Sequence, residues 1–424
     1  MGGRLYISRK SSPDIPPVQY FQVLIKRNSH FSFPIFLCLF ILNGCISQLF
    51  QGPTQVAVNP GTISEIPLRM ENGLIFIEAD IHGTQGWFLF DNGFSQSAIN
   101  PEFARRTGIE FNTSSGLTDF HNKSMDTPKT NVDTTRIGDF NFLKTEFYKI
   151  STDLLFPCTS VHGIIGGNII NAANWEIDFE NQKMRISKEP FSNPGTPLEV
   201  EFKRNNETMV NITIGGKLPI KCKIDFGSNS ALNLRYDVAK LHLAGMAVEE
   251  SEGIRAISTH GPGPIETYYR IVDPLLLSQG DHVLLPAATV LTPRLKYAGY
   301  LGTEYFRQYK VTINSSEEKY ILSPNTTITD TEINYEYGLG LYLLEGKWKI
   351  IQKSLTDTAL VNIPLLDIVA EIDQMPAIQF KDICAFREYL EGKKARKEPL
   401  IVKLQGSEDV VILPFETPKS IILE

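Results

Sequence analysis

The chain has 424 residues, enough for two or three domains, and its hydrophobic content of 42% with 10% aromatic residues is ordinary for a globular protein. Its formal net charge is −7 and its isoelectric point is about 5.7. This charge offers no basic stripe for phosphate groups, so we expect no nucleic-acid partner. The seven histidines have no paired spacing and there is no Cys-x-x-Cys motif, so we expect no metal and no cofactor.

The first 45 residues have the pattern of a targeting segment. Lys26 and Arg27 precede an apolar run, residues 31–42, that is too short to span a membrane as a lasting helix. The run leads into Leu-Asn-Gly-Cys ending at Cys45, which resembles a bacterial lipobox. The resemblance implies lipidation of Cys45 and a lipid-anchored protein of the bacterial cell envelope, periplasmic or at the outer membrane. A plain signal peptide or a short anchor is the alternative.

Three cysteines follow Cys45, one in each predicted domain: Cys158, Cys222 and Cys384. An odd number argues against a disulfide framework, even outside the cytoplasm. We therefore expect buried free thiols.

Residues 46–62 are polar and contain Gly and Pro, which is typical of a tether. Two strand-like runs follow, residues 75–77 and 87–90, rich in β-branched and aromatic side chains. The second run leads into a loop, Asp91-Asn92-Gly93-Phe94-Ser95. Residues 101–108 then combine an early Pro with a terminal Gly, which predicts a short helix.

The same sequence of features returns in the second half of the chain. A strand-like run from Lys221 ends in Asp225-Phe226-Gly227-Ser228, and residues 235–241 predict another short helix. A single Asp-x-Gly means little, because most are turns. Two of them in matching surroundings indicate a repeat.

Further landmarks hold a common offset. Asp91 and Asp225 are 134 positions apart, and three later pairs are each 136 apart: Gly166 and Gly302, Asp178 and Asn314, Ser187 and Ser323. The sequence therefore predicts two copies of one β-rich lobe, residues 63–192 and 193–328.

This arrangement resembles the two-lobed aspartic peptidases, more the bacterial retropepsin-like branch than the secreted pepsin-like enzymes. The resemblance covers roughly residues 64–328 and makes Asp91 and Asp225 the matches of the catalytic aspartates. It implies Gly93 and Gly227 in the active-site loops, hydrophobic-hydrophobic-Gly segments at residues 164–166 and 300–302, and flap hairpins within residues 116–139 and around 259–264.

Paired aspartates suit hydrolysis by an activated water. Two carboxyl groups in such close contact cannot both be ionised, so the pair holds one shared proton. The ionised carboxyl can then remove a proton from water, while the protonated carboxyl donates its proton to a peptide carbonyl oxygen. The resemblance therefore implies an aspartic endopeptidase acting on peptide or protein substrates. Gly93 and Gly227 fit because the loops must approach each other without a Cβ between them.

The middle position of each loop departs from the family. The family has Thr or Ser there, whose hydroxyl hydrogen-bonds across to the other lobe, whereas this chain has Asn92 and Phe226. Asn can still donate and accept, but Phe cannot, so we expect that bond to be unmade or replaced by packing. Ser228, directly after Gly227, occupies the position at which the family has a residue that hydrogen-bonds the aspartate. The corresponding position of the first loop, directly after Gly93, is Phe94, and Ser95 follows it.

Residues 329–424 differ in character. Gly338-Leu339-Gly340-Leu341 resembles the carboxylate-binding loop of PDZ domains, and residues 365–373 resemble a later part of that pattern, with Leu366 where Gly is usual. Residues 380–390 predict a helix, and residues 400–404 and 410–413 the last strands. The resemblance implies a small PDZ-like α+β domain.

Two functions are open from the sequence. The first is a membrane-anchored aspartic endopeptidase in which Asp91 and Asp225 activate a water. The alternative is a catalytically degenerate lipoprotein that binds a peptide or a protein partner. This alternative is suggested by Asn92 and Phe226, which depart from the residues of the family.

Overall fold

The computed structural model describes residues 54–118, 123–258, 261–326 and 337–423. Strands make up 51% and helices 12% of the chain, so the prediction of a mainly β protein is confirmed. The predicted signal segment with Cys45 and residues 46–53 of the predicted tether lie outside the described residues. Among the described residues, no helix is long and apolar enough to cross a membrane.

The elements before residue 190 form a first set of strands with two short helices. They are β1 (Gln55–Ala57), β2 (Ile63–Glu71), β3 (Leu74–Ile81), β4 (Thr84–Phe90), β5 (Ser97–Ile99), α2 (Pro101–Thr107), β6 (Thr113–Thr118), β7 (Ser124–Ile137), β8 (Phe140–Lys149), β9 (Gly163–Ile165), α3 (Gly167–Ile170), β10 (Asn174–Asp178) and β11 (Lys183–Ser187).

Local sequence explains several of these elements. Asn72-Gly73 and His82-Gly83 all have positive φ, the conformation of tight hairpin turns, and they join β2 to β3 and β3 to β4. The predicted helix of residues 101–108 is α2. The Asn100 side chain accepts a hydrogen bond from Glu102 N at its start, and Gly108 ends it in the left-handed region.

The elements from residue 196 to 324 form a second set. They are β12 (Thr196–Phe202), β13 (Thr208–Ile214), β14 (Leu218–Asp225), β15 (Leu232–Arg235), α4 (Tyr236–Leu243), β16 (Ala247–Ile254), β17 (Ile257–Ser258), β18 (Gly261–Pro262), β19 (Ile265–Ile271), β20 (Leu275–Gln279), β21 (His282–Ala287), β22 (Thr289–Thr292), β23 (Gly299–Gly302), α5 (Thr303–Phe306), β24 (Tyr309–Asn314), the 3₁₀ turn η1 (Ser315–Glu317) and β25 (Lys319–Pro324).

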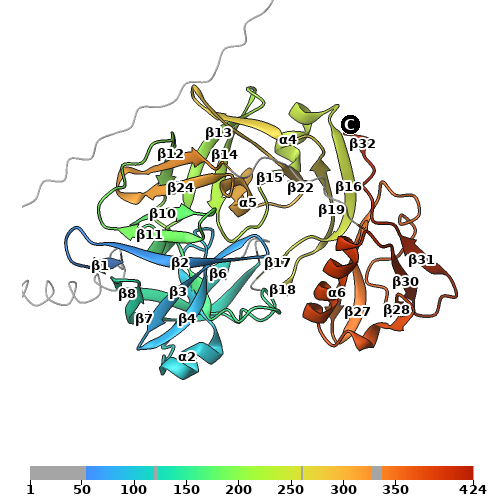
Figure 1. The fold of residues 1–424 in the computed structure, drawn as a ribbon, viewed down its shortest axis with the longest axis horizontal. Coiled ribbons are helices and arrows are strands. Elements are labelled where there is room, and N and C mark those ends of the chain that lie inside the picture. The colour runs from blue at the N-terminus through green and yellow to red at the C-terminus, as the bar shows by residue number, and fades with distance from the viewer. Residues whose placement is uncertain (1–53, 119–122, 259–260, 327–336, 424) are drawn as a thin grey trace, which may run out of the picture. The chain divides into compact units, whose positions relative to one another are not determined.

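The second set repeats strand pairings of the first. β9 lies parallel to β4 and antiparallel to β5, and β23 lies in the same way beside β14 and β15. β10 pairs antiparallel with β24, so the two sets share a sheet at this point (Figure 1). The segments predicted as flaps fall in the antiparallel strand pairs β6–β7 and β16–β19, whose residues 119–122 and 259–260 lie outside the described part.

A continuous aromatic and aliphatic core runs through both sets. Trp175 of β10 is fully buried, its ring is stacked on Phe142, and its centroid lies 5.2 Å from that of Phe90. Next to it on β10, the buried Glu176 carboxylate is paired with Arg185 of β11 and Lys310 of β24. Because a buried carboxylate without cations is costly, these pairs favour the association of β10 with β24.

The remaining elements form a third set. They are β26 (Leu339–Leu344), β27 (Lys347–Ser354), β28 (Val369–Ile372), β29 (Met375–Pro376), the 3₁₀ turn η2 (Ala377–Gln379), α6 (Ile383–Ala395), β30 (Leu400–Leu404), β31 (Val410–Leu413) and β32 (Ile421–Ile422). They enclose a separate small core around Trp348, Phe380 and Phe386. β27 and β32 each pair with β16, which ties the third set to the second.

The predicted last strands are β30 and β31, but the predicted helix of residues 380–390 is displaced. α6 begins at Ile383 because the Asp382 side chain accepts hydrogen bonds from the Cys384 and Ala385 N–H groups and so caps the helix there. Leu366 has a φ of 68°, a conformation that Gly adopts without strain. This position therefore has the backbone that the Gly of the PDZ pattern would favour.

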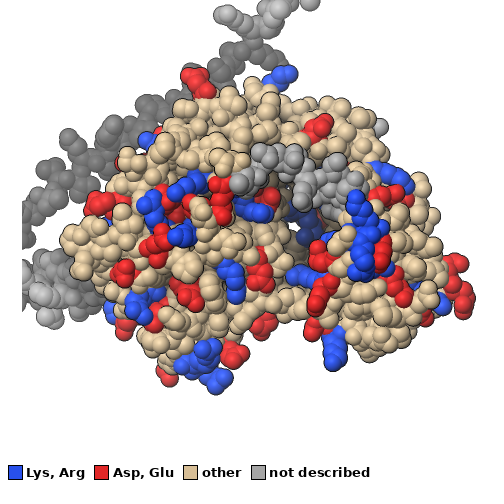
Figure 2. Space-filling model, in the orientation of Figure 1, with Lys and Arg blue, Asp and Glu red and all other residues tan. Residues whose placement is uncertain are grey.

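Acidic and basic side chains are intermixed on the face shown in Figure 2. Exposed pairs such as Lys183 with Glu65 contribute only about 0–1 kcal/mol each. The stability of the fold therefore comes mainly from the buried cores.

The expectation of free thiols is wrong for two of the three cysteines. Cys158 and Cys384 form a disulfide with a Cα–Cα distance of 5.3 Å, and Cys222 is the buried free thiol. The odd count misled because it allows one pair and one remaining thiol, and because the partners are 226 residues apart. The bond joins α6 to the segment between β8 and β9.

We expect reductant to lower the stability of the chain, because the disulfide closes a long loop and such bonds typically contribute about 2–4 kcal/mol. Thermal unfolding with and without reductant measures this loss. The double variant Cys158→Ser/Cys384→Ser is the control and should not respond to reductant. Recovery of Cys158 and Cys384 as free thiols in the unreduced protein by peptide mapping would contradict the assignment.

Candidate active site

Asp91 and Asp225 each stand at the carboxyl end of a buried strand. Asp91 directly follows β4, and its N–H donates to Ile165 O of β9 at 2.9 Å. Asp225 ends β14 and pairs with Gly302 of the neighbouring parallel strand β23. The two strand pairs are built alike, so they present the two aspartates in the same way.

The structure brings the two carboxyls into contact. The Asp91 and Asp225 side chains hydrogen-bond each other. A Cβ placed on Gly93 would lie within 3 Å of the Asp225 carboxyl, and one placed on Gly227 within 3 Å of the Asp91 carboxyl. Each glycine is therefore required by the close approach of the opposite aspartate.

Burial and mutual repulsion govern the ionisation of the pair. Burial raises the pKa of Asp91 to about 8, and the neighbouring Asp225 charge adds to the increase. Burial also raises the pKa of Asp225, while Lys223 lowers it. Two adjacent carboxyls with raised pKa values hold one proton between them over a wide pH range, and the resulting steps belong to the pair.

Backbone N–H groups orient each carboxyl. Phe94 N donates to Asp91 Oδ1 at 3.1 Å, and Gly227 N donates to Asp225 Oδ1 at 3.0 Å. The Ser228 N–H also donates to Asp225, whereas the Ser228 hydroxyl accepts from Ser230 N. Ser228 therefore supports the aspartate through its backbone, while the resemblance had implied its hydroxyl.

Asn92 makes a hydrogen bond from the first loop to the second, as Thr or Ser does at this position in the family that the chain resembles. The Asn92 side chain is fully buried, and its Oδ1 accepts from Phe226 N at 2.9 Å. Its Nδ2 donates to Tyr320 Oη of β25 at 3.2 Å. Both hydrogen-bonding functions of the amide are thus used, so an Asn in place of Thr or Ser leaves no orphaned group here.

At Phe226 the side chain packs against other rings, which is one of the two outcomes that the sequence left open. Its side chain is fully buried, with ring centroids 5.0 Å from Phe306 and 5.9 Å from Phe90. Thr303 Oγ1 donates to Phe226 O at 2.6 Å and holds the backbone of this loop.

Several supporting residues were not predicted from the sequence. Ser97 Oγ accepts from Gly166 N and donates to Asn168, which fixes the first loop against the segment after β9. Tyr320 and Lys223 also escaped prediction, because their roles depend on contacts across the fold. Ser95, which was predicted, lies half-buried in the first loop.

An apolar cluster adjoins the first loop. Phe94 belongs to it together with Leu117 of the β6–β7 hairpin and Phe156. His162 lies at its edge, where its Nδ1 accepts from Trp87 N at 3.0 Å, and burial lowers its pKa. This hydrogen bond gives His162 a structural role.

The predicted carboxylate loop belongs to the third set of strands. Gly338 has a φ of 67°, and its carbonyl accepts from Ser354 N at 2.7 Å. Gly340 and Leu341 lie in β26 at an irregularity of its pairing with β27, and Leu339 begins that strand. These residues are separate from the Asp91 and Asp225 loops.

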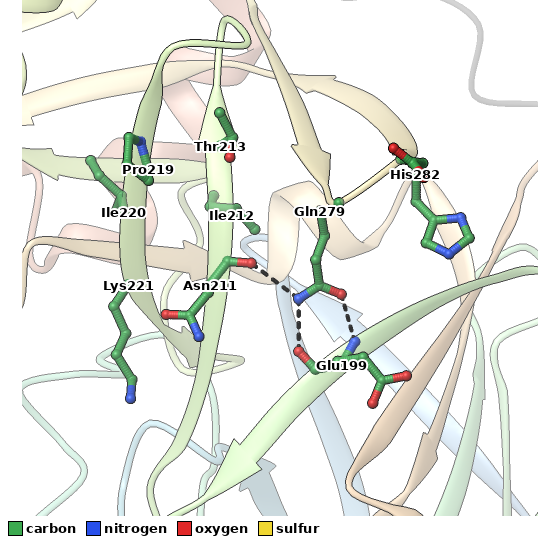
Figure 3. A pocket seen from close by; sticks show the side chains of 11 residues that line it. Glu199, Asn211, Ile212, Thr213, Pro219, Ile220, Lys221, Gln279 and His282 are labelled. Atoms are coloured by element: carbon green, nitrogen blue, oxygen red, sulfur yellow. Dashed lines mark hydrogen bonds between the residues drawn. The ribbon is translucent and has the colours of Figure 1, made fainter.

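A hollow of about 770 Å³ lies on the second set of strands (Figure 3). The Gln279 amide crosses it, accepting from Glu199 N and donating to Glu199 O and Asn211 O. This side chain thereby satisfies backbone groups of β12 and β13. The hollow contains none of the predicted site residues, and within the described ranges no cluster of His, Cys, Asp and Glu could hold a metal ion.

Comparison with known families gives one match. Residues 77–169 match the family model of aspartyl proteases, a segment that contains Asp91, the β6–β7 hairpin and Gly166. This match supports an aspartic peptidase family and a peptidase function in general. No curated protein matches the chain. Asp225 lies outside the matched segment, so its place beside Asp91 is a finding of the structure.

Proposed function

We propose that the chain is an aspartic endopeptidase in which Asp91 and Asp225 activate a water. The observation that carries the proposal is the contact of the buried Asp91 carboxyl with the partly buried Asp225 carboxyl, one from each of two similarly built strand pairs. The repeated pairings support a duplicated lobe, with the two loops meeting at a pseudo-twofold seam. The aspartyl protease match around Asp91 agrees with this chemistry.

The mechanism follows from a pair that carries one proton. The ionised carboxyl removes a proton from water as the water oxygen bonds to the peptide carbonyl carbon. The protonated carboxyl donates its proton to the carbonyl oxygen, which gives a neutral tetrahedral diol. When the C–N bond breaks, the carboxyl that took the proton from water donates it to the leaving nitrogen, and the other carboxyl, now ionised, takes a proton from a diol hydroxyl. The products are a carboxylic acid and an amine, and the pair again holds one proton.

The hairpins β6–β7 and β16–β19 are proposed as flaps that bind an extended peptide. Edge strands bind extended chains through backbone hydrogen bonds, and alternate side chains then enter pockets. The apolar cluster of Phe94, Leu117 and Phe156 favours an apolar side chain next to the scissile bond. The third set of strands is proposed to be a PDZ-like domain that binds a chain terminus near Gly338–Leu341.

We further propose that the protein is lipid-anchored at Cys45 in the bacterial cell envelope. The disulfide between Cys158 and Cys384 supports a location outside the cytoplasm, because such bonds persist in oxidising compartments. Membrane extraction with detergent and mass measurement of the N-terminal peptide test this anchor. An unmodified Cys45 in the mature protein would contradict it.

Incubation of the purified mature protein with an unfolded protein substrate between pH 4 and pH 8 tests the enzymatic activity. We expect new peptide termini that appear equally with and without a chelator, because the proposed chemistry uses only carboxyls and water. Binding of the substrate without any new termini across this range would contradict the proposal and favour the degenerate, peptide-binding alternative.

A further inference from the structure

A buried lysine lies beside the carboxyl pair. Lys223 is two residues before Asp225 on β14, so both side chains point to the same face of that strand. Lys223 is only 6% exposed. A buried ammonium group this close to two carboxyls affects how they ionise.

Lys223 also reaches across to the opposite loop. Its Nζ donates to Gly93 O at 2.7 Å, two residues after Asp91. This bond runs from the second set of strands to the first loop. The bond from Phe226 N to Asn92 Oδ1 runs between the same two parts of the chain. Since Phe226 offers no side-chain hydrogen bond, Lys223 supplies a polar link in addition to the contact of the two carboxyls and the bond from Phe226 N to Asn92.

A neighbouring carboxylate holds the ammonium group in place. Lys223 Nζ contacts Glu207 Oε1 at 2.9 Å, and Glu207 is itself buried. Burial alone would raise the pKa of Glu207, but Lys223 and hydrogen bonds from Tyr297 and Asn205 lower it to about 2. Glu207 is therefore ionised at neutral pH and fixes the direction of the Lys223 side chain.

Other titratable groups around the seam are few among the described residues. Lys296 contacts Glu207 at 3.3 Å, and the Tyr297 ring lies under Lys223 Nζ with its centroid 5.7 Å away. The buried Tyr300 of β23 faces Asp225, which contributes to a raised pKa of this phenol. Tyr297 and Tyr300 stay neutral in the pH range of interest, so Lys223 is the cation that acts on the pair.

We propose that Lys223 is a positioning residue that links the two loops and keeps the Asp91–Asp225 pair singly protonated at neutral pH. Burial and the repulsion between the two carboxylates raise the pKa values of the pair, and the Lys223 cation opposes this increase. Without this cation, both protonation steps of the pair would therefore move to higher pH. The pair would then remain doubly protonated, and lack a base, over more of the acidic to neutral range.

This inference rests on the proposed peptidase function, and matched variants test it. Lys223→Met/Glu207→Gln removes the buried ion pair together, which avoids an unpaired buried charge. We expect both limbs of its pH–rate profile to move up by about one pH unit. Glu207→Gln alone keeps the Lys223 cation and removes the anion that partly cancels its charge. Both limbs of the pH–rate profile of this variant should therefore move to lower pH. Lys221→Met changes an exposed lysine of the same strand and should leave the profile in place.

Carboxyl ¹³C titration of labelled aspartates in the same variants gives a readout that needs no cleavage. An upward shift of the Asp91 and Asp225 titration in the double variant supports the inference even if the wild type cleaves nothing, in which case only the proposed function fails. A folded double variant whose pair titrates as in the wild type overturns the inference, whatever its activity.

Discussion

Asp225→Asn is expected to lower the kcat of peptide cleavage by about 10²–10⁴-fold, the range that a positioned acid or base contributes. Asn has nearly the same shape as Asp but cannot carry the shared proton or become the base. Asp91→Asn should be equally defective, because the reaction needs both members of the pair. Product quantification at the optimal pH of the wild type measures both losses.

The same variants provide a control for folding. Burial raises the pKa of Asp91 to about 8, well above its value of about 3.9 in the unfolded chain. Such a carboxyl favours the folded state most below its unfolded pKa, and this contribution is lost as the pH rises toward 8. Asp91→Asn should therefore be more stable than the wild type at pH 8, and the difference should shrink toward pH 4.

Denaturant unfolding at pH 4 and pH 8 measures this difference. Loss of activity together with a gain of stability at pH 8 is expected of a buried catalytic pair. Cleavage at the wild-type rate by either Asn variant would contradict the role of the pair. An Asp91→Asn chain that is less stable than the wild type at pH 8 would contradict the burial of an ionisable carboxyl there.

Phe226→Ala is expected to lower the free energy of unfolding by about 3–5 kcal/mol. The ring is fully buried between Phe90 and Phe306, so its removal leaves a cavity at the base of the second loop. Because Phe226 N also donates to Asn92, the same cavity should loosen the alignment of the two aspartates. Cleavage should therefore fall as well.

Phe111→Ala is a matched control for this variant. Phe111 is only partly buried and packs at the margin of the same core. Phe111→Ala should therefore lower the free energy of unfolding clearly less than Phe226→Ala. Chemical denaturation of both variants gives the comparison. Equal losses for the two substitutions would show that Phe226 has no special packing role between the loops.

Much of the fold followed from local sequence. The helix between Pro101 and Gly108 uses residues whose backbone preferences are strong in isolation. The two Asp-x-Gly loops were recognisable because each follows an apolar strand, and the common offset of the landmarks between the two halves made Asp91 and Asp225 counterparts.

The parts that escaped prediction depend on contacts between distant residues. Nothing around Lys223 indicates that its ammonium group reaches Gly93, 130 residues earlier. Tyr320 is 228 residues from the Asn92 amide that it supports, and the disulfide partners are 226 residues apart. Each of these contacts requires strand pairings that no local pattern specifies.

Leu366 illustrates the opposite case. The residue itself weakens the resemblance to the PDZ pattern, since Gly is usual there. Its positive φ nevertheless shows that the backbone at this position adopts the conformation a Gly would favour. The backbone requirement is therefore visible in the structure, whereas a reading of the residue type alone would miss it.

Counting the protons on the two aspartates tests the central claim most directly. In ¹³C-labelled wild-type protein, we predict that Asp91 and Asp225 titrate together and that one shared proton remains until about pH 8. In Asp91→Asn, the titration of Asp225 should change because its partner is gone. Two carboxyls that lose their protons independently, each near its ordinary pKa of about 4, would contradict the shared seam.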